Sequence, residues 1–209
     1  MTYLKRNDIL PKKCCKTYAR ADVGYSWPAA KINSYNYSNK PKGALVATLG
    51  AGYVFNSKFR SDITASHRGR YKYSYTDSKK GAVRQEFSSN ALMLNGYLSP
   101  KIFKYAAPYV MGGIGLAINK AGNFLGPFTA IGDSSESFAW QIGVGSLIKI
   151  SENANVDIMY KYVNLGNIKT SSLIKSNSCT GNFSACGNFS AFKGQLKVHE
   201  LSTGISYFF

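Results

Sequence analysis

The sequence predicts an all-β fold, an eight-stranded antiparallel up-and-down transmembrane β-barrel with four longer extracellular loops and short periplasmic turns. Three observations lead to this prediction. Eight segments alternate between apolar residues and small or polar ones, as strands with two different faces do. The connections between these segments are long and short in turn, which is the habit of outer-membrane barrels. The chain ends on two aromatic residues, Phe208 and Phe209, which suits a last strand at a lipid interface.

Length and composition allow one such domain. The chain has 209 residues, and no stretch approaches the roughly 20 consecutive apolar residues of a membrane helix. Its 20 Gly, 15 Tyr and 12 Phe favour strands and tight turns over helices. We expect the barrel to occupy residues 17–209 and residues 1–16 to lie outside it. Residues 1–13 lack the apolar segment of a secretory signal, so we expect no leader there.

The alternating segments follow one another along the whole chain. They span residues 17–27, 43–55, 58–67, 86–98, 107–119, 137–150, 155–165 and 195–209. The sixth is the clearest, because every second residue from Phe138 to Ile150 is apolar except Ser146. Its other face is mostly small or polar, with Leu147 as an exception. The third and fourth segments alternate least clearly.

The remaining segments divide into faces in the same way. In steps of two, their apolar faces run from residue 19 to 27, 45 to 55, 110 to 118, 156 to 162 and 201 to 209. In the third segment the charged residues Arg60 and Asp62 share a face with Thr64. Every segment therefore has the two-sided pattern that a barrel wall requires.

Alternation alone does not say which face lies inside. The polar face is rich in Gly and Ala and carries mid-strand charges of both signs, which suits a narrow lumen where opposite charges pair. Aromatic residues collect near the strand ends, where an interfacial girdle would need them. We therefore predict that the apolar face contacts lipid and that ion pairs fill the lumen, with Lys161 opposite Glu200. The predicted lumen residues are Arg20, Asp22, Arg60, Asp62, Lys161 and Glu200.

No catalytic, cofactor or metal site emerges from the sequence. Neither histidine, His67 or His199, belongs to a Ser-His-acid pattern typical of a catalytic triad. Neither pair of cysteines has further potential metal ligands near it in the sequence. Cys179 and Cys186 could close a small loop in an oxidising compartment. Basic residues fall mostly between strands, whereas nucleic-acid binders interleave them with stacking aromatics on a folded face. We predict a protein that is not an enzyme and binds no nucleic acid.

Six segments, in their order and spacing, resemble the small outer-membrane barrels of the OmpA-like and opacity-protein type, above all the adhesins of rickettsiae. These segments are residues 21–25 (ADVGY), 59–62 (FRSD), 108–115 (PYVMGGIG), 138–141 (FAWQ), 160–166 (YKYVNLG) and 199–209. The resemblance implies a location in the bacterial outer membrane among lipid and lipopolysaccharide. It also implies handover by the barrel-assembly machinery, with Gly204, Tyr207 and Phe209 as the assembly signal. It further implies surface loops that contact host molecules.

The long connections are expected at residues 28–42, 68–85, 120–136 and 166–194. The second is basic and rich in tyrosine, and the chain as a whole has a net charge of +16, which indicates an anionic partner. We predict that this loop binds host-cell surface protein or acidic glycan, since tyrosine and basic side chains are common contact formers. The predicted binding residues are Arg68, Arg70, Tyr71, Lys72, Tyr73, Tyr75, Lys79, Lys80 and Arg84.

Other interpretations stay open at this point. The basic loop could be solvated and neutralised by lipopolysaccharide phosphates of its own membrane. The whole protein could be a passive structural or antigenic barrel without a specific ligand. A soluble lipid-carrying barrel would need the opposite face inward. The fourth loop contains a tandem repeat, GNFSAC and GNFSAF at residues 181–192, which favours an exposed and variable segment.

Overall fold

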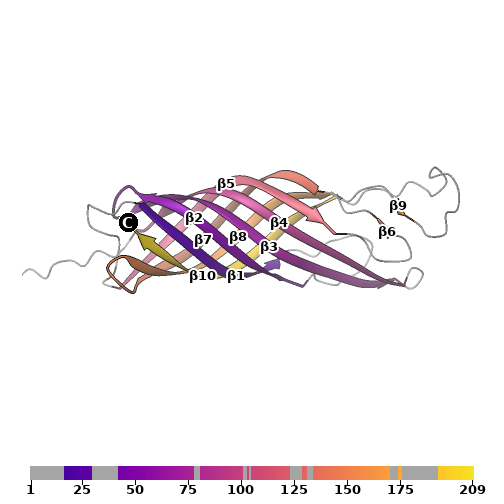
Figure 1. Ribbon diagram of the computed structural model, residues 1–209, viewed down its shortest axis with the longest axis horizontal. Coiled ribbons are helices and arrows are strands. Elements are labelled where there is room, and N and C mark those ends of the chain that lie inside the picture. Colours follow the sequence, from indigo (N-terminus) through magenta and orange to yellow (C-terminus); the bar gives the residue numbers. More distant parts are fainter. Residues whose placement is uncertain are drawn as a thin grey trace, which may run out of the picture.

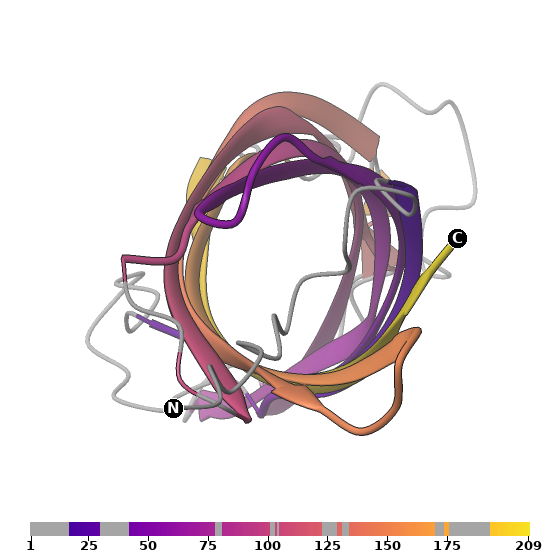
Figure 2. The ribbon, with the colours of Figure 1, turned by 90° about the vertical axis from the view of Figure 1, so that its left-hand side faces the viewer.

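Eight long strands close into an antiparallel barrel (Figures 1 and 2). The computed structural model describes residues 17–29, 42–77, 81–100, 103, 105–122, 129–130, 134–169, 174–175 and 193–209. The strands are β1 (Thr17–Pro28), β2 (Ala44–Val54), β3 (Phe59–Asp77), β4 (Gly81–Leu98), β5 (Ala106–Ala121), β7 (Ser134–Lys149), β8 (Ala154–Lys169) and β10 (Lys193–Phe208). Each pairs with its neighbours in the order β1-β10-β8-β7-β5-β4-β3-β2. The predicted fold class is confirmed.

Two further strands lie outside the barrel. The two-residue strands β6 (Thr129–Ala130) and β9 (Ile174–Lys175) pair with each other at the long-loop end (Figure 1). The described part of the chain has no helix with the length and apolar character needed to cross a bilayer.

The wall of the barrel is apolar outside and polar inside. On the outside, Leu45 is 74% exposed and Ile142 is 56% exposed, whereas Arg20 and Arg60 inside are 4% and 1% exposed. Water would penalise so much exposed apolar surface, at about 25 cal/mol per Å², but a bilayer accepts it. The predicted orientation of the two faces is therefore confirmed.

The lumen is packed with side chains and not open. An apolar cluster closes its periplasmic end, where the short turns lie, and a second apolar cluster occupies the half toward the long loops. Leu147, the exception on the predicted polar face, is fully buried in the first cluster beside Phe208 and Tyr109. These two apolar clusters leave no water-filled channel through the lumen.

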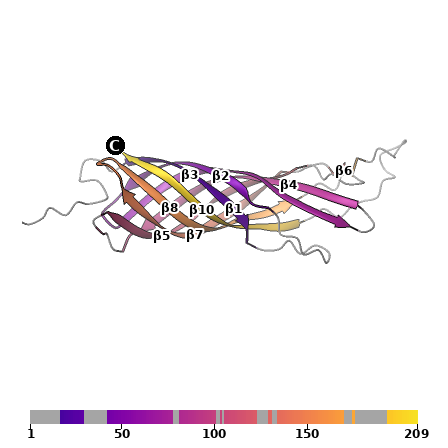
Figure 3. The same cartoon turned by 90° about the horizontal axis from the view of Figure 1, so that it is seen from below.

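The β3 and β4 strands are longer than the sequence predicts. The segment predicted as a loop, residues 68–85, is largely a two-stranded hairpin, because β3 continues to Asp77 and β4 begins at Gly81. This hairpin projects past the other strands of the barrel (Figures 1 and 3). A bulge between Arg68 and Tyr71 shifts its register, so the exposed Arg70 and Lys72 lie on the outer face.

A second bulge shapes the opposite wall. The register between β8 and β10 shifts between Gln195 and Lys197, and Gly166 in β8 has a φ of 76°. A side chain at Gly166 would also collide with Ser137. Glycine is needed here because the left-handed conformation disfavours other residues.

Candidate functional site

Arg20 is the centre of the lower ionic layer in the lumen. Its guanidinium lies 2.8 Å from Asp22 Oδ1, 3.3 Å from Asp62 Oδ2 and 3.3 Å from Asp157 Oδ2. It also donates a hydrogen bond of 2.9 Å to the hydroxyl of Tyr97. These groups come from β1, β3, β4 and β8, so the layer ties four strands together across the lumen. Such links are strong only because each buried charge is paired.

Arg60 lies beside this layer in a cage of three tyrosine rings. Its guanidinium carbon is 4.1 Å from the ring centre of Tyr97, 4.8 Å from Tyr109 and 5.6 Å from Tyr18. One guanidinium nitrogen is 3.6 Å from Asp157 Oδ2. Cation–π attraction of this kind is strongest where water is absent, and it supports a fully buried cation here.

Glu200 organises the upper ionic layer. Its carboxylate lies 2.5 Å from Arg68 Nε and 3.1 Å from Lys161 Nζ. The hydroxyl of Ser26 donates a 3.2 Å hydrogen bond to Glu200 and lies 2.7 Å from the hydroxyl of Tyr71. The structure thus places Lys161 opposite Glu200, with their strands β8 and β10 paired at these residues.

Two of the residues predicted to bind on a surface loop, Arg68 and Tyr71, lie inside the barrel. Arg68 is fully buried in the lumen and Tyr71 is 1% exposed, so the prediction that both lie on a surface loop is wrong. Arg68 continues the inward positions 60, 62, 64 and 66 of β3. Extending the third predicted strand, residues 58–67, by one residue would have found it.

The charges of the lumen cancel. Among the described residues, four cations and four carboxylates are buried there: Arg20, Arg60, Arg68, Lys161, Asp22, Asp62, Asp157 and Glu200. The net charge of +16 therefore resides on the rest of the chain. The lumen is a neutral structural core, and the anion-attracting surface is outside it.

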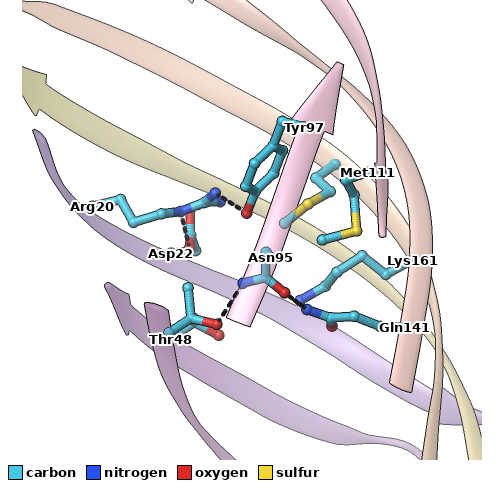
Figure 4. Close-up of a pocket in the computed structure, with 10 residues that line it drawn as sticks. Arg20, Asp22, Thr48, Asn95, Tyr97, Met111, Gln141 and Lys161 are labelled. Atoms are coloured by element: carbon cyan, nitrogen blue, oxygen red, sulfur yellow. Dashed lines mark hydrogen bonds and ion pairs between the residues drawn. The ribbon is translucent and has the colours of Figure 1, made fainter. Parts of the chain in front are cut away.

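A small polar cavity separates the two ionic layers (Figure 4). Its volume is about 10 Å³, roughly what one water molecule needs. The hydrogen bond from Gln141 Nε2 to Asn95 Oδ1, 2.5 Å long, crosses the lumen beside it. Lys161 and Arg20 line the cavity from the upper and lower layers (Figure 4). The cavity has no room for a larger ligand.

The rest of the predicted binding segment lies on the projecting hairpin. Arg70 is exposed and pairs with Glu86 at 3.2 Å. Lys72 is exposed, and its carbonyl accepts a 2.9 Å hydrogen bond from the backbone N–H of Lys42. Only the strand backbone is described for the predicted residues Tyr73, Tyr75 and Arg84. The predicted residues Lys79 and Lys80 lie outside the described residues.

The predicted assembly signal occupies the end of β10. Tyr207 and Phe209 point outward, with their ring centres 5.3 Å apart. Gly204 faces Asp22 so closely that a side chain there would overlap the carboxylate. Recognition of these residues by the assembly machinery stays a prediction.

Neither described histidine lies in the lumen. His67 Nδ1 is 2.6 Å from Asn90 Oδ1, and His199 Nδ1 is 2.7 Å from the hydroxyl of Tyr160, both on the outer wall. Within the described ranges, no group of three or more His, Cys, Asp or Glu residues could hold a metal ion. Cys179 and Cys186, which could close a small loop, lie outside these ranges, as does the tandem repeat.

A lipid-facing apolar wall around a closed, charge-paired lumen defines a small β-barrel of the bacterial outer membrane. The chain belongs to the family described as outer membrane protein beta-barrel domain, whose family model matches residues 16–209. The predicted location in the outer membrane is thereby confirmed.

Relatives and solved structures agree with this assignment. The outer membrane protein PagN of Salmonella typhimurium is 27% identical over 64% of this chain. The "Putative adhesin RC1281" of Rickettsia conorii is 22% identical over 66% of it. The matches span 62% and 61% of those two proteins.

Two solved barrels share the fold at low identity. Neisserial surface protein A is 16% identical, with a TM-score of 0.57 over 92% of this chain and 97% of its own. OprG of Pseudomonas aeruginosa is 15% identical, with a TM-score of 0.59 over 92% and 96%.

Proposed function

We propose that this chain is a surface adhesin that attaches to acidic groups of host-cell proteins or glycans through the long-loop end of its barrel. The observation that carries the proposal is a pair of lysines at the base of the projecting hairpin. Lys42 and Lys72 face each other across an isolated antiparallel bridge, and both are exposed. Among the described residues, neither forms an ion pair.

Two like charges in this arrangement repel each other. Side chains directly opposite in an antiparallel pair have Cβ atoms about 4.5–5.5 Å apart, and like charges there destabilise the pairing. An anionic group bound between the two ammonium groups removes this repulsion. A carboxylate, sulfate or phosphate on a host surface has the required charge, and attraction over the surrounding basic surface speeds its approach.

Other features support an attachment role for the barrel. A relative from Rickettsia conorii carries the name of an adhesin. The neutral lumen leaves the positive charge for surfaces that a partner can reach. The relatives that the chain matches are named as an outer membrane protein and as an adhesin, and we propose that this protein is not an enzyme.

Charge reversal of the lysine pair tests the proposal. Bacteria displaying the Lys42→Glu, Lys72→Glu variant should attach to host cells several-fold less than bacteria displaying the unchanged protein. The remaining attachment should depend less on salt, because screening acts on the charges that have been removed. The matched control is Lys58→Glu, at an exposed position in the turn between β2 and β3 at the other end of the barrel. It should attach normally.

Attachment of the double variant at the unchanged level would overturn the proposal. Equal surface display of all variants, measured by antibody labelling of intact cells, separates lost binding from lost export. If bacteria displaying the unchanged protein attach no better than bacteria that lack it, the protein is a passive barrel.

A further inference from the structure

One side of the outer wall carries a continuous patch of aromatic rings. The patch, called here the outer aromatic patch, is made of outward-facing residues on the neighbouring strands β1, β10, β8 and β7: Tyr25, Trp27, Trp140, Tyr160, Tyr162 and His199. Successive ring centres are 5.3–6.4 Å apart. Each ring therefore touches another member of the patch.

His199 is the centre of this patch. Its strand neighbours at the same register are Trp27 on β1 and Tyr162 on β8. Its ring stacks on Trp27 at 6.1 Å and on Tyr160 at 5.9 Å, and Tyr162 meets it edge-on at 5.3 Å. The hydroxyl of Tyr160 lies 2.7 Å from His199 Nδ1. These contacts fix the rings as one platform.

The patch is not part of a uniform girdle. On the loop-side halves of β2 to β5, the described outward residues are aliphatic, small or polar, with His67 as the only ring. Exposed Leu45, Leu92, Leu116 and Ile118 lie there instead. An aromatic girdle that only anchors a barrel in the interface would surround it. A platform on one side of the barrel is suited to a partner that lies along that side.

The residues above and below the patch indicate what this partner is. Toward the long loops, the next outward positions on β10 and β8 are Lys197 and Asn164, which pair across the strands. Toward the bilayer centre, the outward residues are the exposed aliphatics Val23, Ile158 and Leu201. Along β10 the outward residues thus change from aliphatic Leu201 to aromatic His199 to cationic Lys197 in the direction of the cell exterior.

This sequence of surfaces matches one class of molecule. In a phosphorylated glycolipid of the outer leaflet, acyl chains, sugar rings and phosphates follow one another in the same direction. Acyl chains pack on aliphatic side chains, the C–H faces of sugars stack on aromatic rings, and a phosphate pairs with a lysine near the membrane surface. Phosphatidylglycerol carries a phosphate but no sugar ring that could stack on the patch.

We propose that the outer aromatic patch is a docking site for a phosphorylated glycolipid of the outer leaflet. Its sugar rings lie against Trp27, His199 and Tyr162, and a phosphate lies at Lys197. This site faces the membrane of the bacterium and is separate from the lysine pair that binds the host.

The two tryptophans of the chain, Trp27 and Trp140, are both in the patch, so their fluorescence reports directly on the site. The refolded barrel in nanodiscs of neutral phospholipid is titrated with diphosphoryl lipid A or, separately, with phosphatidylglycerol. The expected result is a saturable change in tryptophan emission with lipid A and a much weaker one with phosphatidylglycerol. An equal response to both lipids would overturn the proposal, because it would reflect charge alone.

Variants test the residues by native mass spectrometry of the bound lipid. The Trp27→Leu, Tyr162→Leu, His199→Leu variant keeps the wall apolar but should retain lipid A at least about tenfold less, since each ring contact contributes measurably. The single change Tyr162→Leu should show a smaller loss in the same direction if the triple variant does not fold.

Lys197→Gln should abolish the preference for phosphorylated over dephosphorylated lipid A. His67→Leu, on the far wall, should bind normally, and undiminished binding by both ring variants would refute the site.

Discussion

Buried carboxylates that each serve two cations hold the lumen together at the residue scale. Glu200 pairs with Arg68 and Lys161, and Asp157 lies near both Arg20 and Arg60. An unpaired charge in such surroundings is strongly destabilising. The lower layer holds two cations and three carboxylates, and the upper layer holds two cations and one carboxylate. The charges of the lumen therefore balance only when both layers are taken together.

Glu200→Gln should be one of the most destabilising single changes in the barrel. It removes the charge that compensates two buried cations, so we expect a loss of about 3–5 kcal/mol in the free energy of unfolding. Urea unfolding in detergent, followed by the gel-mobility difference between folded and unfolded barrel, measures it. The matched control Glu86→Gln breaks only the exposed pair with Arg70 and should cost less than about 1 kcal/mol. Similar losses for both variants would contradict this account.

The sequence indicates which residues carry the lumen charges better than it indicates their partners. Lys161 opposite Glu200 follows from one hairpin, because neighbouring strands set that pair. The contacts of Arg20 with Asp62 and Asp157 join β1 to β3 and β8. The contact with Asp62 reaches past the intervening strand β2, and the contact with Asp157 needs closure of the barrel through β10. Pairing of neighbouring strands therefore predicts neither contact.

Element boundaries at the scale of strands depend on bulges, which the alternation rule does not include. The eight strands follow from period-two patterning because lipid and lumen impose opposite demands on alternate residues. Past Arg68 the bulge changes the parity of β3, and the hairpin beyond it leaves the membrane. Without a lipid face, its basic and tyrosine-rich sequence looks like a loop although it is paired as strands.

Gly166→Ala should weaken the barrel through the second bulge. A side chain at a φ of 76° is strained, and here it would also collide with Ser137. We expect a loss of about 1–2 kcal/mol or more from the backbone alone. The comparison is Gly112→Ala on β5, where an added carbon comes no nearer than 4.0 Å to another atom and should change stability by less than about 0.5 kcal/mol. Thermal unfolding in detergent compares the two variants. Equal melting temperatures would show that a side chain at residue 166 does not strain the bulge.

Charge and packing are separated between inside and outside at the scale of the whole molecule. The described lumen is neutral and filled, while the remainder of the chain carries the excess of +16. A barrel of eight strands is narrow enough for side chains to fill it. The function therefore belongs to the outer surfaces and the rim.

Planar bilayers containing the purified barrel should show no steady ion current. Two apolar clusters and two paired ionic layers block the path, and the cavity between them holds roughly one water molecule. Current recordings at positive and negative voltages, with a general porin as positive control, measure the conductance. A stable open level proportional to the number of inserted barrels would be incompatible with the packed lumen.

The pairing of β1 with β10 has a consequence for biogenesis. These strands are the first and last of the barrel in chain order, and the backbone N–H of Phe209 donates to the carbonyl of Thr17 across their seam. The ring cannot close until β10 is present, so closure has to follow the synthesis and export of the last strand. The same seam brings the two ends of the barrel together, which makes circular permutation through a periplasmic turn geometrically simple.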